Sequence, residues 1–147
     1  MSSALGIQKK VEDSIWLLHA FFQQWFTGAI ENKDEKFSYV LNTFGDDFTM
    51  VTIKGDLESR AEVIAGLKEG WGRLSMFQIF IEEVRIVYAS EGGVLAQYLE
   101  KQVIAGDLNM RRTTVLFKVD GSELIWKYVH ETALVLNPST EAAIAPV

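Results

Sequence analysis

The sequence predicts an α+β fold in which a strongly curved antiparallel sheet wraps around a long N-terminal helix. Helical periodicity is concentrated in the first 70 residues, and four long segments rich in β-forming residues follow between residues 76 and 132. Short turns that contain glycine join these segments, which is typical of antiparallel neighbours. Helices and strands that are segregated along a chain indicate the α+β class. At 147 residues, 48% hydrophobic and 23% charged, we expect one globular domain over residues 1–136.

Three helices are expected in the first half of the chain. Residues 5–32 form the long one, because apolar residues recur there at spacings of three and four. A short helix over residues 35–43 follows, and a third begins after Ser59, which forms a capping box with Glu62, and ends near Gly70. His19 lies on the margin of the apolar stripe of the first helix. It is either a boundary histidine with its polar tip in water or a residue that reaches the mouth of a pocket.

The strands begin with residues 48–53, which alternate in polarity and turn back into a very short partner. Residues 76–89 form a long strand whose apolar positions change from odd to even numbers. One extra residue near Glu82 and Glu83 would reconcile the two halves, so we predict a β-bulge there. Strands over residues 94–104, 109–119 and 123–132 complete the sheet.

The pairing of the last three strands depends on two turns. Loops over residues 105–107 and 120–122 would set Glu100 opposite Arg112, and Arg112 opposite His130. The even-numbered residues would then share the inner face of the sheet. A slip of one residue would move them to the other face. The candidate ligand-binding residues on that face are Tyr98, Glu100, Arg112, Thr114, Trp126, Tyr128, His130 and Thr132.

Three roles are open for the predicted row of Glu100, Arg112 and His130. Arg112 could orient a small acidic or oxygenated apolar ligand inside a cavity. The trio could instead be a satisfied structural network, because buried charges are normally paired. Glu100 or His130 could also be a catalytic acid or base, although a neighbouring arginine favours ionised Glu100 and neutral His130.

The opposite, odd-numbered face of the sheet is predicted to be a partner surface. It carries an apolar patch with charged residues around it, which is typical of an interface. We expect a homodimer formed through the outer face by Leu99, Val115, Phe117 and Val129. The alternative is that a loop or the C-terminal tail covers the patch.

Composition excludes several classes of function. The net charge is −6 and the basic residues are scattered, so nucleic-acid binding is not expected. There is no cysteine and no set of residues with metal-ligand spacing, so neither a metal site nor a cofactor is predicted. No signal peptide or membrane helix is recognised, so a cytoplasmic location is expected. Residues 137–147 contain two prolines and many small residues, and we expect a mobile tail.

Two segments carry a resemblance to a known family. The ending DGSELIWKYVHET and the preceding YLEKQ and RRTT resemble the nuclear transport factor 2-like (NTF2-like) superfamily, in its SnoaL-like branch, over roughly residues 8–135. The superfamily includes polyketide cyclases, ketosteroid isomerases, scytalone dehydratase and the association domain of calcium/calmodulin-dependent kinase.

The resemblance implies a cystatin-like cone with a cavity, and dimers that form through the convex face. It also implies that Trp126, Tyr128, His130 and Thr132 point inward from the last strand, and that Arg112 and Thr114 do so from the strand before it. Thr132 stands where many members have a second histidine, and no aspartate matches the general base of the isomerases. We therefore expect, in this order, a ligand-binding dimer, an isomerase, cyclase or dehydratase, or an interaction module without a ligand.

Overall fold

The computed structural model describes residues 4–135 of the chain, so the predicted C-terminal tail lies outside the described residues. The helices are α1 (Ala4–Thr27), α2 (Asp34–Thr43) and α3 (Arg60–Glu69). The strands are β1 (Phe44–Val51), β2 (Leu57–Ser59), β3 (Phe77–Ala89), β4 (Gly93–Ile104), β5 (Asp107–Asp120) and β6 (Glu123–Ala133).

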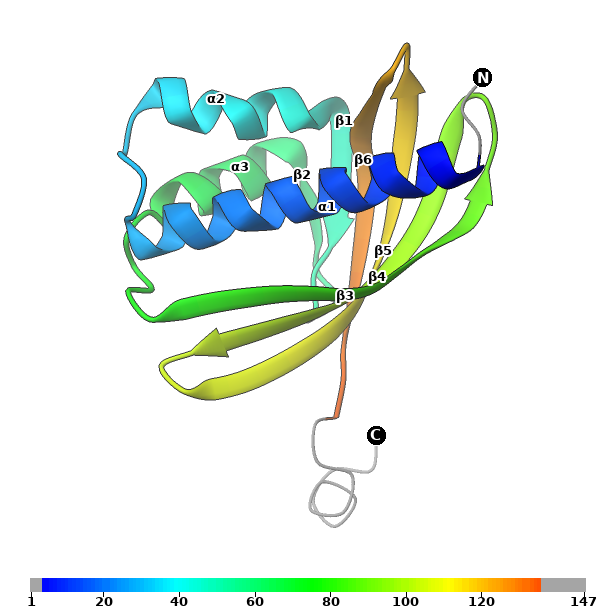
Figure 1. Cartoon of the computed structure of the whole chain (residues 1–147). Helices are drawn as coiled ribbons and strands as arrows, with labels where there is room; N and C mark the ends of the chain where they lie inside the picture. Colours follow the sequence, from blue (N-terminus) through cyan, green and yellow to red (C-terminus); the bar gives the residue numbers. More distant parts are fainter. Residues whose placement is uncertain (1–3, 136–147) are drawn as a thin grey trace.

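The six strands form one curled sheet in the order β2-β1-β6-β5-β4-β3. Neighbours pair antiparallel except β1 and β6, which are parallel. Helix α1 crosses one face of the sheet, and α2 and α3 lie beside it near β1 and β2 (Figure 1). The predicted α+β fold, with a curved sheet around a long N-terminal helix, is confirmed.

The helix boundaries follow local chemistry. Helix α1 ends at Thr27 rather than at residue 32, because Gly28 adopts a φ of +78°, a left-handed conformation that terminates helices. The predicted capping box is present at α3. The Ser59 hydroxyl accepts a hydrogen bond from the Glu62 amide at 3.2 Å, and the Glu62 carboxylate accepts one from the Ser59 amide at 2.9 Å.

The predicted bulge in β3 is confirmed. The pairing of β3 with β4 shifts between Glu82 and Arg85, and Glu83 has a φ of 54°. A bulge bends a strand and increases its twist, which helps the sheet to curl under α1.

The predicted register between β4 and β5 is wrong by one residue. The turn consists of Ala105 and Gly106 alone, both with positive φ, and Ile104 pairs with Asp107. Two residues with positive φ are characteristic of a type I′ hairpin turn, which is one residue shorter than the loop expected from the sequence. Glu100 therefore pairs with Arg111, and the odd-numbered residues of β5 face α1.

An irregularity in the pairing of β5 with β6 determines which residues of β6 point towards α1. The turn between the two strands is Gly121 and Ser122, and Phe117 pairs with Trp126, but a shift places Leu116 opposite Tyr128. The extra residue in β6 is Lys127. Trp126 therefore points inward as predicted, whereas beyond the bulge the inward positions are odd-numbered, at Val129 and Glu131.

The hydrophobic core lies between α1 and the concave face of the sheet. Val115 and Phe117 are fully buried in it, and Val129 is 5% exposed. The expected homodimer surface is therefore wrong at these three positions. The shorter turn at Ala105 directs Val115 and Phe117 inward, and the bulge at Lys127 directs Val129 inward. Leu99 lies on the outer face, where it pairs with Arg112 and is only 4% exposed.

Polar side chains hold α1 over both halves of the sheet. The Gln23 side-chain oxygen accepts a hydrogen bond from the Ile79 amide of edge strand β3 at 3.0 Å. Towards the other edge, the indole nitrogen of Trp126 in β6 donates to the Ser14 hydroxyl at 3.0 Å. These two hydrogen bonds connect α1 to both halves of the sheet, and the cavity described below lies between α1 and the sheet.

Candidate ligand-binding cavity

A cavity of about 170 Å³ lies between α1 and the sheet. Its walls come from helices α1 and α3 and from strands β1, β4 and β6. Most of the side chains that line it are apolar, and five are aromatic rings of Phe or Trp. The lining residues are Leu18, His19, Phe22, Phe26, Phe44, Phe48, Met50, Val63, Leu67, Tyr98, Glu100, Gln102, Trp126, Val129 and Glu131.

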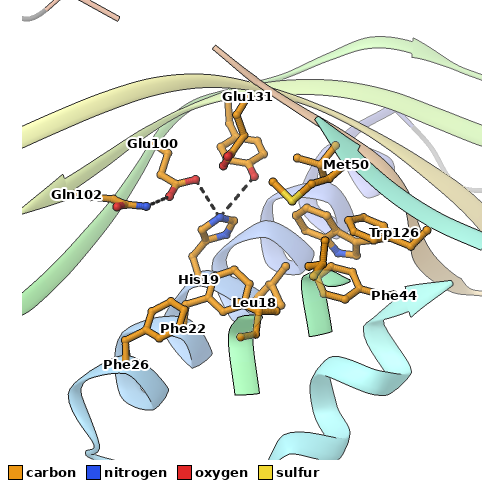
Figure 2. Close-up of a pocket in the computed structure, with 15 residues that line it drawn as sticks. Leu18, His19, Phe22, Phe26, Phe44, Met50, Glu100, Gln102, Trp126 and Glu131 are labelled. Atoms are coloured by element: carbon orange, nitrogen blue, oxygen red, sulfur yellow. Dashed lines mark hydrogen bonds and ion pairs between the residues drawn. The ribbon is translucent and has the colours of Figure 1, made fainter. Parts of the chain in front are cut away.

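The polar groups of the cavity gather on one side. His19 extends from α1 towards Glu100 on β4, with Gln102 and Glu131 nearby, whereas Phe44 and Trp126 lie away from this group (Figure 2). Tyr98 joins them from β4, because residues two apart on a strand share a face. The cavity therefore has an apolar body and a single polar wall.

His19 is the centre of a hydrogen-bond network. Its Nδ1 lies 2.7 Å from the carbonyl oxygen of Ile15, and since a carbonyl only accepts, Nδ1 carries a hydrogen. Its Nε2 lies 3.2 Å from Glu100 Oε1 and 3.4 Å from the Tyr98 hydroxyl (Figure 2). The other oxygen of Glu100 accepts a hydrogen bond from the Gln102 amide at 2.6 Å.

His19 and Glu100 form a buried ion pair. Burial alone would lower the pKa of His19, but the charge of Glu100 and hydrogen bonds to Glu100 and Ile15 outweigh it, so this pKa is raised. Burial alone would raise the pKa of Glu100, but the charge of His19 and hydrogen bonds from His19 and Gln102 leave it lowered. Both shifts favour the charged forms, with protons on both nitrogens of the imidazolium.

Glu131 is the second carboxyl group of the cavity, and its pKa is displaced in the opposite direction. Burial and the negative charge of Glu100 raise the pKa of Glu131, although Arg111, 3.5 Å away, opposes this. Burial, followed by the charges of Glu100 and Glu131, holds the pKa of the Tyr98 hydroxyl well above its usual value, so this group stays protonated. The polar wall thus combines an ionised carboxylate, an imidazolium, a phenol and a carboxyl group that takes up a proton more readily than usual.

The structure divides the residues predicted for the site into two sets. Tyr98, Glu100 and Trp126 line the cavity. The other five lie together on the outer face of the sheet, so the predicted row of Glu100 with Arg112 and His130 is wrong. That set consists of Arg112, Thr114, Tyr128, His130 and Thr132.

The outer set has partners of its own. Arg112 is 42% exposed and lies 3.9 Å from Glu83, which is at the bulge of β3. The Thr114 hydroxyl accepts a hydrogen bond from Gln97 at 3.1 Å, and the Tyr128 hydroxyl lies 3.2 Å from Nδ1 of His130. None of these side chains faces Glu100. The short turn at Ala105 directs Arg112 and Thr114 outward, and the bulge at Lys127 does the same for the three residues of β6.

Sequence reasoning missed Glu131 and Gln102 as lining residues, and it left the role of His19 open. A signal was available in β5, where the odd positions Val115 and Phe117 are apolar and the even positions 112, 114 and 118 are polar. A strand with one buried face shows this alternation. It therefore indicated that odd residues of β5 face the core, and Glu131 follows from the bulge at Lys127.

Within residues 4–135, no group of three His, Asp or Glu side chains is arranged to hold a metal ion. Among the described helices, none is both long and apolar enough to cross a membrane.

Solved structures show that the fold is shared with NTF2-like and cystatin-like proteins. An NTF-2-like protein of unknown function from Pseudomonas aeruginosa is 22% identical, with a TM-score of 0.79 over 84% of this chain and 98% of that one. A scytalone dehydratase-like protein from Novosphingobium aromaticivorans is 10% identical, with a TM-score of 0.69 over 89% and 86%. A calcium/calmodulin-dependent kinase II association-domain-like protein from Exiguobacterium sibiricum is 13% identical, with a TM-score of 0.61 over 93% and 98%. The predicted NTF2-like fold is confirmed, and membership of the SnoaL-like branch stays a prediction.

Sequence comparison adds a narrower assignment. No curated protein matches the chain. Residues 11–135, which include every strand of the sheet and all residues that line the cavity, match a single protein family. The chain therefore belongs to the family described as sucrose-6-phosphate phosphohydrolase C-terminal.

Proposed function

We propose that this chain binds a small, neutral, single-ring molecule that carries one hydroxyl or carbonyl oxygen. The observation that supports the proposal is the cavity beneath α1, with its apolar body and one polar wall. Small-molecule sites in proteins are mostly apolar and use a few polar groups to fix orientation. An interaction module without a ligand would be better served by a solid interior.

The size of the cavity sets the size of the ligand. An engineered apolar cavity of about 150 Å³ is sufficient to hold benzene. The cavity here is about 170 Å³, which leaves room for one six-membered ring and an oxygen substituent. Phe22, Phe44 and Trp126 would contact the ring, while the oxygen would lie against the Tyr98 hydroxyl and Glu131.

The charge of the wall favours a neutral ligand. In the described part of the chain, the residues that line the cavity include two glutamates and neither lysine nor arginine. The cationic group of this lining, His19, is already paired with Glu100 at 3.2 Å, so an incoming anion would find no free positive charge to offset its loss of hydration. The cavity therefore does not suit a sugar phosphate, the compound after which the family is described, nor the acidic ligand that we expected Arg112 to orient.

Calorimetric titration with phenol, benzene and benzoate tests this function. We expect phenol to bind more tightly than benzene because of its hydrogen bond, and benzoate to bind at least about tenfold more weakly than phenol, which corresponds to 1.4 kcal/mol. Val63→Phe should abolish binding because it fills the cavity, whereas Val87→Phe, the same change at a position outside the cavity, should have no effect. Equal affinity in these two variants, or preference for benzoate, would refute the proposal.

A second candidate function is proton transfer on a ketone, and a specific observation favours it. The pKa values of Glu100 and Glu131 are displaced in opposite directions within one apolar cavity. Two titratable groups with environments that separate their pKa values are a common basis for acid–base catalysis. Glu131 would accept a proton from the carbon beside the carbonyl, and the Tyr98 hydroxyl would donate a hydrogen bond to the carbonyl oxygen.

The exchange of hydrogen for deuterium next to the carbonyl of cyclohexanone measures this activity directly by NMR. The wild-type protein should accelerate the exchange, and Glu131→Gln should lower the rate by about 10²–10⁴-fold, the usual contribution of a general base. Glu131→Gln should still bind cyclohexanone. A wild-type protein that binds cyclohexanone without accelerating exchange would leave binding as the function and exclude proton transfer.

A further inference from the structure

A second cavity of about 190 Å³ also has His19 in its lining, and it opens to solvent past Trp16, Ala20 and Gln24, which are exposed. It is formed between α1 and edge strand β3, whereas the first cavity lies over β4, β6 and β1. Its lining residues are Trp16, His19, Ala20, Gln23, Gln24, Ile79 and Ile81. His19 is the one residue that lines both cavities.

His19 lies where the buried cavity and the open cavity meet. Its side chain leaves the middle of the helix and meets Glu100 on β4. Glu100 pairs across the sheet with Ile81, which lines the second cavity. The imidazole ring therefore lies between α1, which carries it, and Glu100 on β4 (Figure 2).

The ring is held firmly in this position. Both of its nitrogens have partners, at the Ile15 carbonyl and at Glu100. Phe22 and Tyr98 contact it edge-on, with ring centroids 5.3 Å and 5.4 Å from that of His19. His19 is 4% exposed, so little of its side chain is in contact with water.

We infer that His19 determines ligand size, because its ring separates two cavities that would otherwise form one chamber large enough for a two-ring molecule. This inference rests on the proposed binding function of the first cavity. The wild-type protein then accepts one ring, and a variant without the imidazole accepts two fused rings. The polar end of the larger ligand would still reach Tyr98 and Glu131.

The test requires a variant that removes the ring without leaving a buried charge. His19→Ala alone would leave the buried Glu100 carboxylate without its positive partner. The informative variant is therefore His19→Ala combined with Glu100→Gln. Glu100→Gln alone is the matched control, because it makes the same charge change at residue 100 and keeps the ring. Adding Ala20→Phe to the double variant places a new side chain in the second cavity and should restore the original size limit.

Titration of phenol and 2-naphthol against these variants measures the size limit. The ratio of the affinity for 2-naphthol to that for phenol should rise at least about tenfold in the double variant over Glu100→Gln, since the second ring buries more apolar surface. In the triple variant, which adds Ala20→Phe, the ratio of the two affinities should return to about its value in Glu100→Gln. A ratio that is the same in the double variant and in Glu100→Gln overturns the inference.

A crystal structure of the double variant decides the inference without any ligand. One continuous chamber supports it, and neighbouring side chains that collapse into the space of the ring refute it. If the wild-type protein binds neither phenol nor 2-naphthol, the proposed function fails. The crystal structure of the double variant still tests the role of His19 in that case. If wild-type protein binds phenol but the chamber stays divided, the proposed function stands and the inference fails.

Discussion

Replacing His19 by leucine is expected to lower the free energy of unfolding by about 3–5 kcal/mol, the usual cost of removing one partner from a buried ion pair. Glu100 is 3% exposed, and its main positive partner would be lost. Leucine has nearly the volume of histidine, so the loss would come from the unpaired carboxylate rather than from an empty space. Chemical denaturation at neutral pH provides the measurement.

The double variant His19→Leu with Glu100→Gln provides the control. It removes both charges and keeps an amide at position 100, so it should recover most of the lost stability. If His19→Leu alone costs less than about 1 kcal/mol, the pair resembles an exposed salt bridge and the account of the polar wall is wrong.

The advantage of the wild type over this double variant should depend on pH. Glu100 has a lowered pKa, so its contribution is complete above the ordinary value of 4.5 and is lost as pH falls through the folded-state pKa. His19 has a raised pKa, so its contribution is complete below 6.5 and is lost as pH rises through the folded-state pKa. The difference in unfolding free energy should therefore be greatest between pH 4.5 and 6.5 and smaller on either side.

Phe117→Ala is expected to cost about 3–5 kcal/mol, because the ring is fully buried against Trp126 and leaves a cavity when it is removed. The neighbouring change Leu116→Ala should cost about 1 kcal/mol, because that side chain is only partly buried on the outer face. Denaturation of the two variants tests which face of β5 points inward. The register expected from a three-residue turn at residue 105 would give the reverse order, with Leu116 as the costly position.

Much of the fold could be predicted from the sequence. The periodicity of α1, the capping box at Ser59 and the change of phase in β3 each come from local rules that tertiary structure did not override. The bulge at Glu83 illustrates this, because apolar positions on both sides of it required one extra residue. The end of α1 could also have been predicted, since Gly28 is a common helix terminator.

The candidate site was harder to predict because it depends on register. Ala105 adopts a φ of 51°, which is unusual for alanine, and the turn is therefore one residue shorter than its composition suggests. That single residue moved Arg112 and Thr114 outward and brought Arg111 and Phe117 inward. Tyr98 and Glu100 were placed correctly because they precede the first turn. Trp126 points inward because the second turn is also one residue shorter than the predicted loop over 120–122, which cancels the first shift as far as Lys127.

His19 required tertiary information of another kind. Its spacing on α1 left it at the edge of the apolar stripe, where a surface position and a buried one were both open. His19 can be buried because Glu100, which is 81 positions away in the sequence, supplies the negative charge that a buried imidazolium requires.

A titration of ¹⁵N-labelled protein with phenol, followed by NMR, tests most directly whether the cavity beneath α1 is a ligand site. The indole of Trp126 borders that cavity, whereas the indole of Trp16 is half exposed and lies outside it. We predict that phenol shifts the Trp126 indole signal in a saturable manner and leaves the Trp16 signal unchanged. Saturable shifts at Trp16 with none at Trp126 would contradict the account.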